Sequence, residues 1–213
     1  MPKVEFKSGK LTLEGYLELP RGAGPFPACI VCHPHSLYGG EMHNNVVIGV
    51  CSHLVKSQIA ALRFNFRGVG RSQGEFGGGI GEQEDAIAAL EFLLQRDEID
   101  AERIALAGYS FGAFVGLAAL NGNENIKALV GISPPLTLFE FSYLKNCTKP
   151  KLLMMGEMDQ FTPLKVFKEF YEKIPEPKDK RIIEGADHFY WGYENEVGQV
   201  VADFLKKTFE NIP

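Results

Sequence analysis

The sequence has no hydrophobic run long enough to cross a membrane and no cluster of lysine or arginine residues. A transmembrane helix needs about 20 consecutive apolar residues, so the first absence excludes a membrane span. The net charge of -5 and the dispersed basic residues argue against a surface that binds nucleic acid. Residues 1–6 also lack the apolar core of a signal peptide. We therefore expect a cytoplasmic protein that contacts neither membranes nor nucleic acids.

Cysteine is scarce as well, with four residues at positions 29, 32, 51 and 147. The spacing of Cys29 and Cys32 would suit a redox pair or half of a zinc site. However, both lie in the apolar run 28–32, and in a strand their sulfur atoms would point to opposite faces. No second CxxC or His-x-His pair completes a metal site. We expect buried structural thiols, no metal and no other cofactor.

The order of apolar segments predicts an α/β fold. At 213 residues, with no repeat, linker or low-complexity tract, the chain should form one domain over residues 1–213. Strands that alternate with helices indicate a mostly parallel twisted sheet covered by helices on both faces. The expected strands are an antiparallel hairpin in residues 3–19 and the segments 28–32, 60–66, 103–107, 126–132, 151–155 and 181–183. The expected helices are 44–57, 83–95, 111–120, 163–174 and 194–209.

One short motif gives this fold a chemical interpretation. Between the expected strand 103–107 and the helix 111–120 the chain reads GYSFG, a G-x-S-x-G motif centred on Ser110. At a strand-to-helix junction this motif is typical of a nucleophile elbow. The turn is tight enough to strain the serine backbone, and side chains at positions 108 and 112 would collide with neighbouring elements. The serine hydroxyl then lies at a helix N-terminus, which favours a developing negative charge.

A serine nucleophile needs a base, and the base needs an acid that holds it in the correct tautomer. In this architecture the chain order is serine, acid, histidine. Of the five histidines only His188 follows Ser110, and it lies in the loop beyond the last strand. Glu157 and Asp159 both follow the strand 151–155, and we favour Asp159. Asp187 is the alternative, although a residue adjacent to His188 can rarely reach its Nδ1 atom.

Acyl transfer also requires donors for an oxyanion. The N–H of Phe111, directly after the nucleophile, is one candidate. The second should come from the loop after strand 28–32; Pro34 has no N–H, so His35 is favoured and Ser36 comes second. The His33 or His35 side chain could instead bind a metal, but no acidic or cysteine partner lies at ligand spacing.

Taken together, Ser110, Asp159 and His188 make the chain resemble an α/β-hydrolase along nearly its whole length. The segments CHPHSLYGG (residues 32–40) and NFRGVG (residues 65–70) are similar to a small, uncharacterised, lidless branch close to the dienelactone-hydrolase-like proteins. That branch usually has proline where this chain has Ser36. The serine nucleophile differs from the cysteine of dienelactone hydrolase and the aspartate of haloalkane dehalogenases. The resemblance implies hydrolysis of an ester, thioester or amide through an acyl-serine.

The resemblance also bears on the loop RGVGRS (residues 67–72), which looks superficially like a phosphate-binding loop. It lacks the P-loop lysine pattern and the glycine spacing of a dinucleotide site. In the family this loop is structural. Arg67 and Arg71 could still contact an anionic part of a substrate.

The substrate is expected to be a small acyl compound in an open site. Many α/β-hydrolases insert a helical lid between two late strands, but residues 133–150 are too few for a lid domain. Candidate apolar walls, each of which could instead be ordinary core, are Leu37, Tyr38, Phe139, Phe141, Tyr190 and Trp191. A carboxylesterase is the favoured interpretation. A thioesterase or peptidase on the same residues, or a ligand-binding protein that retains the fold, are the alternatives, and the chain could be a monomer or a homodimer.

Overall fold

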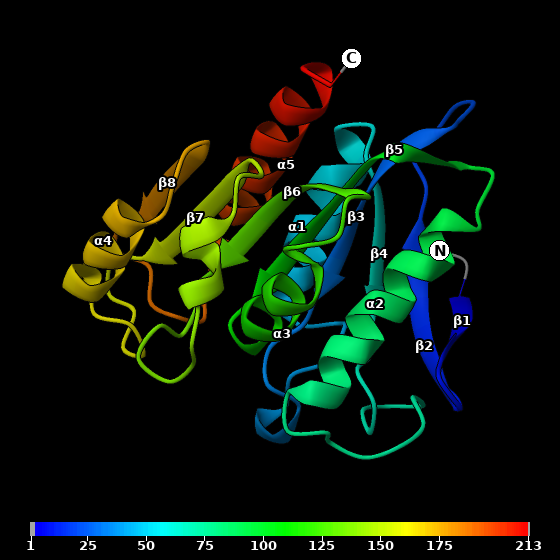
Figure 1. Cartoon of the computed structure of the whole chain (residues 1–213), viewed down its shortest axis with the longest axis horizontal. Helices are drawn as coiled ribbons and strands as arrows, with labels where there is room; N and C mark the ends of the chain where they lie inside the picture. The colour runs from blue at the N-terminus through cyan, green and yellow to red at the C-terminus, as the bar shows by residue number, and fades with distance from the viewer. Residues whose placement is uncertain (1–2, 213) are drawn as a thin grey trace.

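Eight strands form one sheet in the order β1-β2-β4-β3-β5-β6-β7-β8, with helices on both faces (Figure 1). The computed structural model describes residues 3–212. Met1, Pro2 and Pro213 are part of the expected domain but lie outside the described residues. Met1 and Pro2 also belong to the segment 1–6, whose lack of an apolar core argues against a signal peptide. The strands are β1 (Lys3–Ser8), β2 (Leu11–Glu18), β3 (Phe26–Cys32), β4 (Ala60–Phe64), β5 (Ile99–Tyr109), β6 (Ile126–Ile132), β7 (Lys151–Gly156) and β8 (Lys178–Ile183). The helices are α1 (Asn45–Lys56), α2 (Ile80–Leu94), α3 (Phe111–Leu120), α4 (Leu164–Lys173) and α5 (Glu194–Glu210), with short 3-10 turns η1 (Ser36–Tyr38) and η2 (Ser142–Asn146).

Strand β2 runs in the direction opposite to the other seven strands of this sheet. It pairs antiparallel with β1 and with β4, as the hairpin signal predicts. The strands from β4 across to β8 are all parallel to one another. The carboxyl ends of β3, β5, β6, β7 and β8 therefore meet at one edge, which is where open α/β sheets place their ligands. The α/β fold with a mostly parallel sheet is confirmed.

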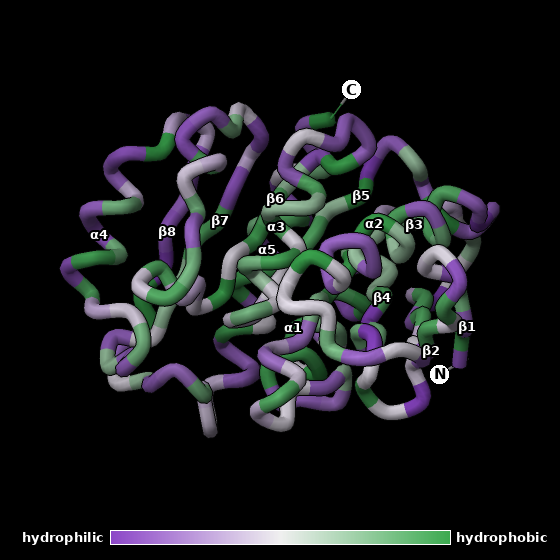
Figure 2. The backbone as a smooth tube through the Cα atoms, turned by 60° about the horizontal axis from the view of Figure 1, so that its bottom comes forward, coloured by the Kyte–Doolittle hydropathy of each residue, from purple (hydrophilic) through white to green (hydrophobic). Residues whose placement is uncertain are grey.

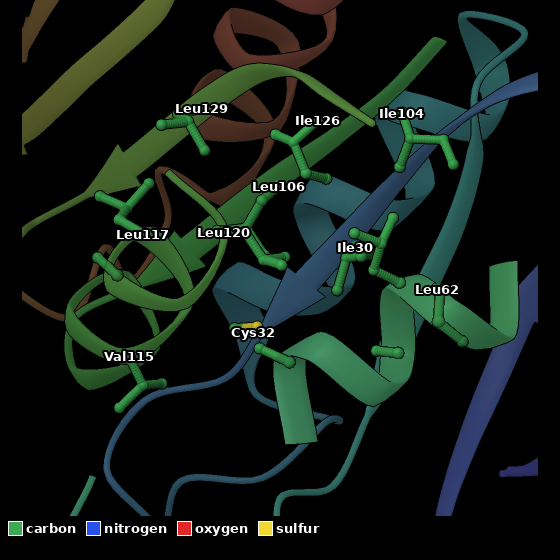
Figure 3. Close-up of a cluster of buried hydrophobic side chains, with 14 of the residues drawn as sticks. Ile30, Cys32, Leu62, Ile104, Leu106, Val115, Leu117, Leu120, Ile126 and Leu129 are labelled. Carbon is green, nitrogen blue, oxygen red and sulfur yellow. The ribbon is translucent and has the colours of Figure 1, made fainter. Parts of the chain in front are cut away.

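The sheet separates two apolar clusters. One packs α2, α3 and α4 onto the first face, and Figure 3 shows its central part, where Ile30, Leu106 and Leu129 meet residues of α3. The other packs α1 and α5 onto the opposite face. Helix α3, FGAFVGLAAL, is apolar all round, which is typical of a buried helix. In Figure 2 the edge strand β8 is mainly hydrophilic, consistent with its sequence KDKRII, and such charged edges discourage pairing with another chain.

The cysteine prediction is confirmed. Cys29 belongs to one apolar cluster and Cys32 to the other, so their side chains lie on opposite faces of β3. All four cysteines are buried and free of disulfides. Among residues 3–212, none of the helices is both long and apolar enough to cross a bilayer.

The boundaries that differ from expectation have identifiable causes. Helix α2 begins at Ile80 rather than at residue 83, because the Glu82 carboxylate accepts the N–H groups of Gly77 (2.8 Å) and Gly79 (2.7 Å) and caps the first turn. Ile80 is exposed and breaks the apolar period that sequence reasoning follows. Strands β3, β5 and β8 begin earlier than expected, since proline or charged residues at their first positions mask the strand pattern.

His33 ties the end of β3 to the end of β4. Its Nε2 atom accepts a hydrogen bond from the N–H of Phe66 at 3.0 Å, and its Nδ1–H donates to the carbonyl of Pro34 at 2.7 Å. The bond at Nε2 needs the neutral imidazole, because a protonated Nε2 cannot accept a hydrogen bond. Burial lowers the pKa of His33 from its ordinary value of 6.5 to about 4, although the Pro34 carbonyl and the Asp85 charge act in the opposite direction. His33 is therefore a structural residue of this edge.

The crossing of α3 over β3 should not tolerate a side chain at Gly112. A methyl group there would lie 2.3 Å from the carbonyl oxygen of Cys32, so Gly112→Ala should lower the free energy of unfolding by about 1–3 kcal/mol. Gly122→Ala is the matched control, because nothing lies within 4 Å of its Cβ position and its effect should stay within about 0.5 kcal/mol. Urea unfolding measures both, and equal stabilities would contradict this account of the crossing.

His33 should make the protein sensitive to mild acid. As pH falls below 6.5 the unfolded chain protonates this imidazole, whereas the folded chain does not until about pH 4, so the free energy of unfolding should fall by about 2–3 kcal/mol between pH 7 and 4.5. Gln at position 33 can still accept the Phe66 N–H but does not titrate. Urea unfolding of the wild type and His33→Gln at both pH values should therefore show a smaller acid loss in the variant. An identical loss in both proteins would rule out His33 as its source.

Candidate active site

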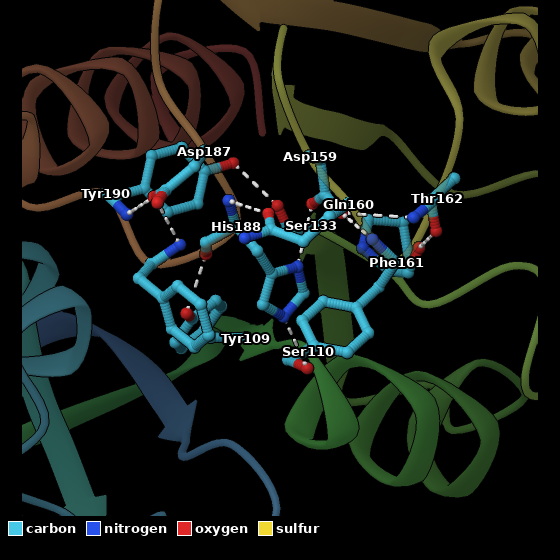
Figure 4. A network of polar contacts seen from close by, with 12 residues as sticks. Tyr109, Ser110, Ser133, Asp159, Gln160, Phe161, Thr162, Asp187, His188 and Tyr190 are labelled. Atoms are coloured by element: carbon cyan, nitrogen blue, oxygen red, sulfur yellow. Dashed lines mark hydrogen bonds and ion pairs between the residues drawn. The ribbon is translucent and has the colours of Figure 1, made fainter.

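Three polar side chains meet where β5, β7 and β8 end. Ser110 directly follows β5, Asp159 follows β7, and His188 lies in the loop after β8. Figure 4 shows the imidazole of His188 between the other two side chains. Because these strands are parallel neighbours or nearly so, residues far apart in the sequence reach one edge. The structure thus brings together the three residues that the sequence analysis singled out.

Ser110 occupies a strained turn. Its backbone angles are φ 54 and ψ -117, a region that non-glycine residues rarely adopt. The close approach of Gly108 to the backbone of Gly112, where a Cβ atom would lie 2.3 Å from the Gly112 carbonyl, enforces this geometry. The Ser110 N–H donates to the carbonyl of Ile132 at 2.8 Å, which anchors the turn to β6. The Oγ atom is left 3.0 Å from His188 Nε2.

His188 is held on several sides. Its Nδ1 atom lies 2.7 Å from Asp159 Oδ2, so the tautomer with a proton on Nδ1 donates to the carboxylate and leaves Nε2 to accept from Ser110. Its backbone N–H donates to Gln160 Oε1 at 3.2 Å, and its carbonyl accepts from the Tyr109 hydroxyl at 2.8 Å. The ring of Phe161 packs edge-on against the imidazole, with centroids 4.6 Å apart. These contacts fix both the loop and the ring.

Asp159 is buried but well supplied with donors. Its Oδ1 atom accepts the N–H groups of Phe161 (2.9 Å) and Thr162 (3.0 Å), while Oδ2 faces His188. Burial by itself would raise the pKa of this carboxyl. The hydrogen bond and charge of His188, followed by hydrogen bonds from Ser133 and Thr162, outweigh burial and hold the pKa of Asp159 below its ordinary value. Asp159 is therefore an ionised acceptor at neutral pH.

The two other carboxylates considered for this position have different partners. Glu157 Oε2 accepts the N–H of Gly185 at 3.1 Å. Asp187 Oδ1 accepts the N–H groups of Phe189 (2.9 Å) and Tyr190 (3.2 Å). Both shape the loop that carries His188, whereas Asp159 contacts its ring.

The expected oxyanion donors flank the same place. Phe111 is the first residue of α3, and the first N–H groups of a helix have no partner within it. The His35 ring packs on the Phe111 ring with centroids 4.5 Å apart, so the loop after β3 lies beside the start of α3. His35 Nδ1 accepts the N–H of Leu37 at 3.2 Å and so begins η1. The roles of the Phe111 and His35 N–H groups stay predictions.

Two of the six proposed substrate walls are wrong. Phe141 is 2% exposed and packs in the core against Phe114, and Tyr190 is fully buried with its hydroxyl 2.9 Å from Ser133 Oγ. Neither can meet a substrate that enters from solvent, because core packing already encloses both rings. The misassignment arose because an aromatic residue in a loop does not reveal which way its side chain turns.

The remaining four wall candidates are accessible to different extents. Leu37, Tyr38 and Trp191 are 66%, 87% and 72% exposed. Phe139 is partly buried and lies against Phe111, with ring centroids 6.0 Å apart. Their contact with a substrate stays a prediction.

Sequence reasoning missed several residues that support the site. Tyr109 occupies the first variable position of G-x-S-x-G, and Gln160 and Phe161 follow the acid directly. Ser133 is the first residue after β6, at the same sheet edge. Position immediately after a buried parallel strand was the available signal for Ser133.

Arg67, the first of the two arginines in the 67–72 loop, has a structural role. The Arg67 guanidinium pairs with the fully buried Asp85 at 2.8 Å and with Glu84 at 3.0 Å, which fixes the loop onto α2. Arg71 is exposed. Within residues 3–212, no three His, Cys, Asp or Glu side chains are grouped so that they could hold a metal ion.

This geometry matches known protein families. Residues 85–211 match the family described as PET hydrolase-like, and residues 27–142 match the family described as serine aminopeptidase, S33. Each match spans more than half of the chain. Shorter matches include cutinase est2 of Thermobifida alba, 31% identical over 131 residues, and thiohydrolase apmlB of Arthrinium phaeospermum, 32% identical over 143 residues. They cover 56% and 65% of this chain, but only 42% and 45% of those two proteins.

Other relatives match over nearly the full length. An uncharacterized protein of Rickettsia prowazekii (strain Madrid E) is 34% identical over 96% of this chain and 89% of its own. A structure described as an alpha-beta serine hydrolase homologue from Coxiella burnetii is 32% identical with a TM-score of 0.86, covering 95% of this chain and 96% of that one. A Xanthomonas campestris structure described as an a/b serine hydrolase without lid is 29% identical with a TM-score of 0.85, covering 97% and 94% of the two chains. These matches and the sheet order together show that the chain belongs to the α/β-hydrolase superfamily.

Proposed function

We propose that the protein is a serine hydrolase that cleaves small carboxylic esters through an acyl intermediate on Ser110. The observation that carries this proposal is the continuous contact from Ser110 Oγ through the His188 ring to Asp159, with lengths of 3.0 Å and 2.7 Å. A general base must lie within hydrogen-bond reach of the proton that it removes, and His188 Nε2 does. Asp159 stabilises the imidazolium that results.

The reaction has two halves. In the first, the Ser110 proton passes to His188 Nε2 as Oγ attacks the ester carbonyl carbon. The oxyanion that forms accepts hydrogen bonds from the N–H groups of Phe111 and His35. Collapse expels the alkoxide, which takes the proton from Nε2 and leaves as an alcohol. In the second half, water gives a proton to Nε2 and attacks the acyl carbon. The bond between the acyl carbon and Oγ then breaks, the proton on Nε2 returns to Oγ, and the carboxylic acid leaves.

The surroundings of the site favour an apolar ester. Phe161 is 40% exposed and lies beside His188. The ring of Phe189, which is also exposed, has its centroid 6.3 Å from the centroid of the Phe161 ring. Residues 133–150 contain only the short turn η2, so the site is open and could accept short to medium acyl groups. The partial match to a cutinase supports ester cleavage, whereas the match to a thiohydrolase supports a thioester as the second candidate.

Covalent labelling tests the nucleophile. A fluorophosphonate probe should label the wild type, and Ser110→Ala should abolish labelling and lower ester turnover by about 10⁴-fold or more, because no other hydroxyl contacts His188 Nε2 in the described site. Ser57→Ala, at the far end of α1, is the control and should label normally. Circular dichroism should show both variants folded. Labelling that persists in folded Ser110→Ala would contradict the assignment, and an unlabelled wild type would favour a ligand-binding protein.

Substrate preference can be measured directly. Nitrophenyl esters of two to twelve carbons should be hydrolysed with a higher kcat/KM than acyl-CoA thioesters of the same chain length or aminoacyl amides, because the exposed groups beside the triad are apolar. An acyl-CoA preferred at every chain length would replace the esterase proposal with a thioesterase. A preferred amide would indicate a peptidase.

A further inference from the structure

Helix α1, which packs on the opposite face of the sheet from α3, contacts the loop that carries His188. Asn45 is the first residue of α1, and its Nδ2 atom donates to the carbonyl of Phe189 at 3.0 Å and to Glu194 Oε1 at 3.1 Å. Phe189 directly follows His188, and Glu194 is the first residue of α5. One side chain of α1 therefore connects the loop of the proposed base to the helix that follows it, and the mechanism above does not use this contact.

The orientation of the Asn45 amide follows from its two partners. A backbone carbonyl such as that of Phe189 only accepts hydrogen bonds. Burial by itself would raise the pKa of Glu194, but the hydrogen bond from Asn45, together with backbone hydrogen bonds, holds this pKa below its ordinary value. The carboxylate is therefore ionised at neutral pH and also only accepts. Only the amide nitrogen, which carries two protons, can satisfy both partners.

A close crossing of α1 and α5 places this amide. A Cβ atom at Gly49 would lie 2.7 Å from the Glu194 carbonyl oxygen, and one at Gly198 would lie 2.5 Å from the Gly49 carbonyl oxygen. Gly49 lies four residues after Asn45 and so on the same face of α1. Figure 1 shows both helices behind the sheet. The backbone contact at Gly49 thus brings the Asn45 side chain to the start of α5.

The other contacts of the His188 segment act on neighbouring peptide groups. The Tyr109 hydroxyl donates to the His188 carbonyl at 2.8 Å, and Gln160 Oε1 accepts the His188 N–H at 3.2 Å. Burial raises the pKa of Tyr109, so its hydroxyl stays protonated and can donate. Both bonds fix the peptide groups on either side of His188. Asn45 fixes the next peptide group along the chain, through the Phe189 carbonyl.

We propose that Asn45 is a positioning residue for the proposed base: by fixing the Phe189 carbonyl, it keeps the His188 ring in line between Ser110 and Asp159. The inference rests on the proposed function of the site. His188 Nε2 lies 3.0 Å from Ser110 Oγ, so a small shift of the loop would take the base out of hydrogen-bond reach. A misplacement of about 1 Å can cost about a hundredfold in rate. A contact with the residue after His188 therefore affects turnover without touching the substrate.

The test is ester hydrolysis by whole-chain Asn45→Asp, which removes both donor protons and keeps the size of the side chain. A negative charge in the first turn of a helix is favourable, so α1 should stay intact. With nitrophenyl butyrate, kcat per site titrated to completion by the fluorophosphonate probe should fall about three- to ten-fold, as expected for loss of one hydrogen bond. KM should change by less than about two-fold, because the apolar groups beside the triad remain. The urea midpoint should also fall, since the new carboxylate faces Glu194.

A compensating substitution separates positioning from stability. In Asn45→Asp/Glu194→Gln the new amide can donate to the new carboxylate, which restores the link between α1 and α5 with its direction reversed. The new carboxylate still cannot donate to the Phe189 carbonyl. The double variant should therefore recover the wild-type urea midpoint while kcat stays about three- to ten-fold low. Glu194→Gln alone keeps an acceptor for Asn45 and should match the wild type in both measurements.

Asn211→Asp is the matched control. Asn211 Nδ2 donates to the Lys207 carbonyl at 2.7 Å at the other end of α5, so this substitution removes the same kind of bond away from the site and should leave kcat unchanged. Unchanged kcat in Asn45→Asp, or recovery of kcat together with the urea midpoint in the double variant, would overturn the inference. If Asn45→Asp does not fold, the kcat of the double variant decides. A wild type that the fluorophosphonate probe does not label would instead refute the proposed function.

Discussion

The close crossing of β5, α3 and the end of β3 constrains everything at this edge. Gly112 lies so near the Cys32 carbonyl that a methyl group would overlap it at 2.3 Å, and Gly108 lies equally near Gly112. The chain can turn between them only if Ser110 takes a left-handed conformation. That conformation directs the hydroxyl toward His188 rather than into the core, so the strain of one residue is inseparable from the contact on which the proposed chemistry depends.

A second requirement is the treatment of a buried charge. Asp159 lies in an environment that would neutralise it, yet the N–H groups of Phe161 and Thr162 and the Nδ1–H of His188 stabilise the carboxylate. The surrounding tyrosines are buried and neutral, and the Tyr109 hydroxyl fixes the His188 backbone. Residues that follow β5, β7 and β8 thus meet in one line of contact from Ser110 through His188 to Asp159, which explains why the parallel order of these strands matters for the site.

Sequence patterns predicted this arrangement unevenly. The alternation of strands and helices, the turn at Ser110 and the buried thiols of Cys29 and Cys32 followed from periodicity and local motifs, because those features depend on short-range physics. Sequence also favoured Asp159 over Asp187 by simple reach. Side-chain direction in loops did not follow: Tyr190 and Phe141 point inward, and Phe161 beside His188 was overlooked. Tertiary contacts across the sheet edge decide those directions, and no local pattern in the sequence encodes them.

The central claim is that an acyl group passes through Ser110. Rapid mixing with a slowly deacylating nitrophenyl ester, acid quenching and peptide mass spectrometry would observe that step directly. The account predicts the acyl mass on the peptide that contains Ser110, formed in a burst that matches the first nitrophenol released. Steady release of nitrophenol from folded protein with Ser110 unmodified, or with the acyl group on another residue, would contradict it.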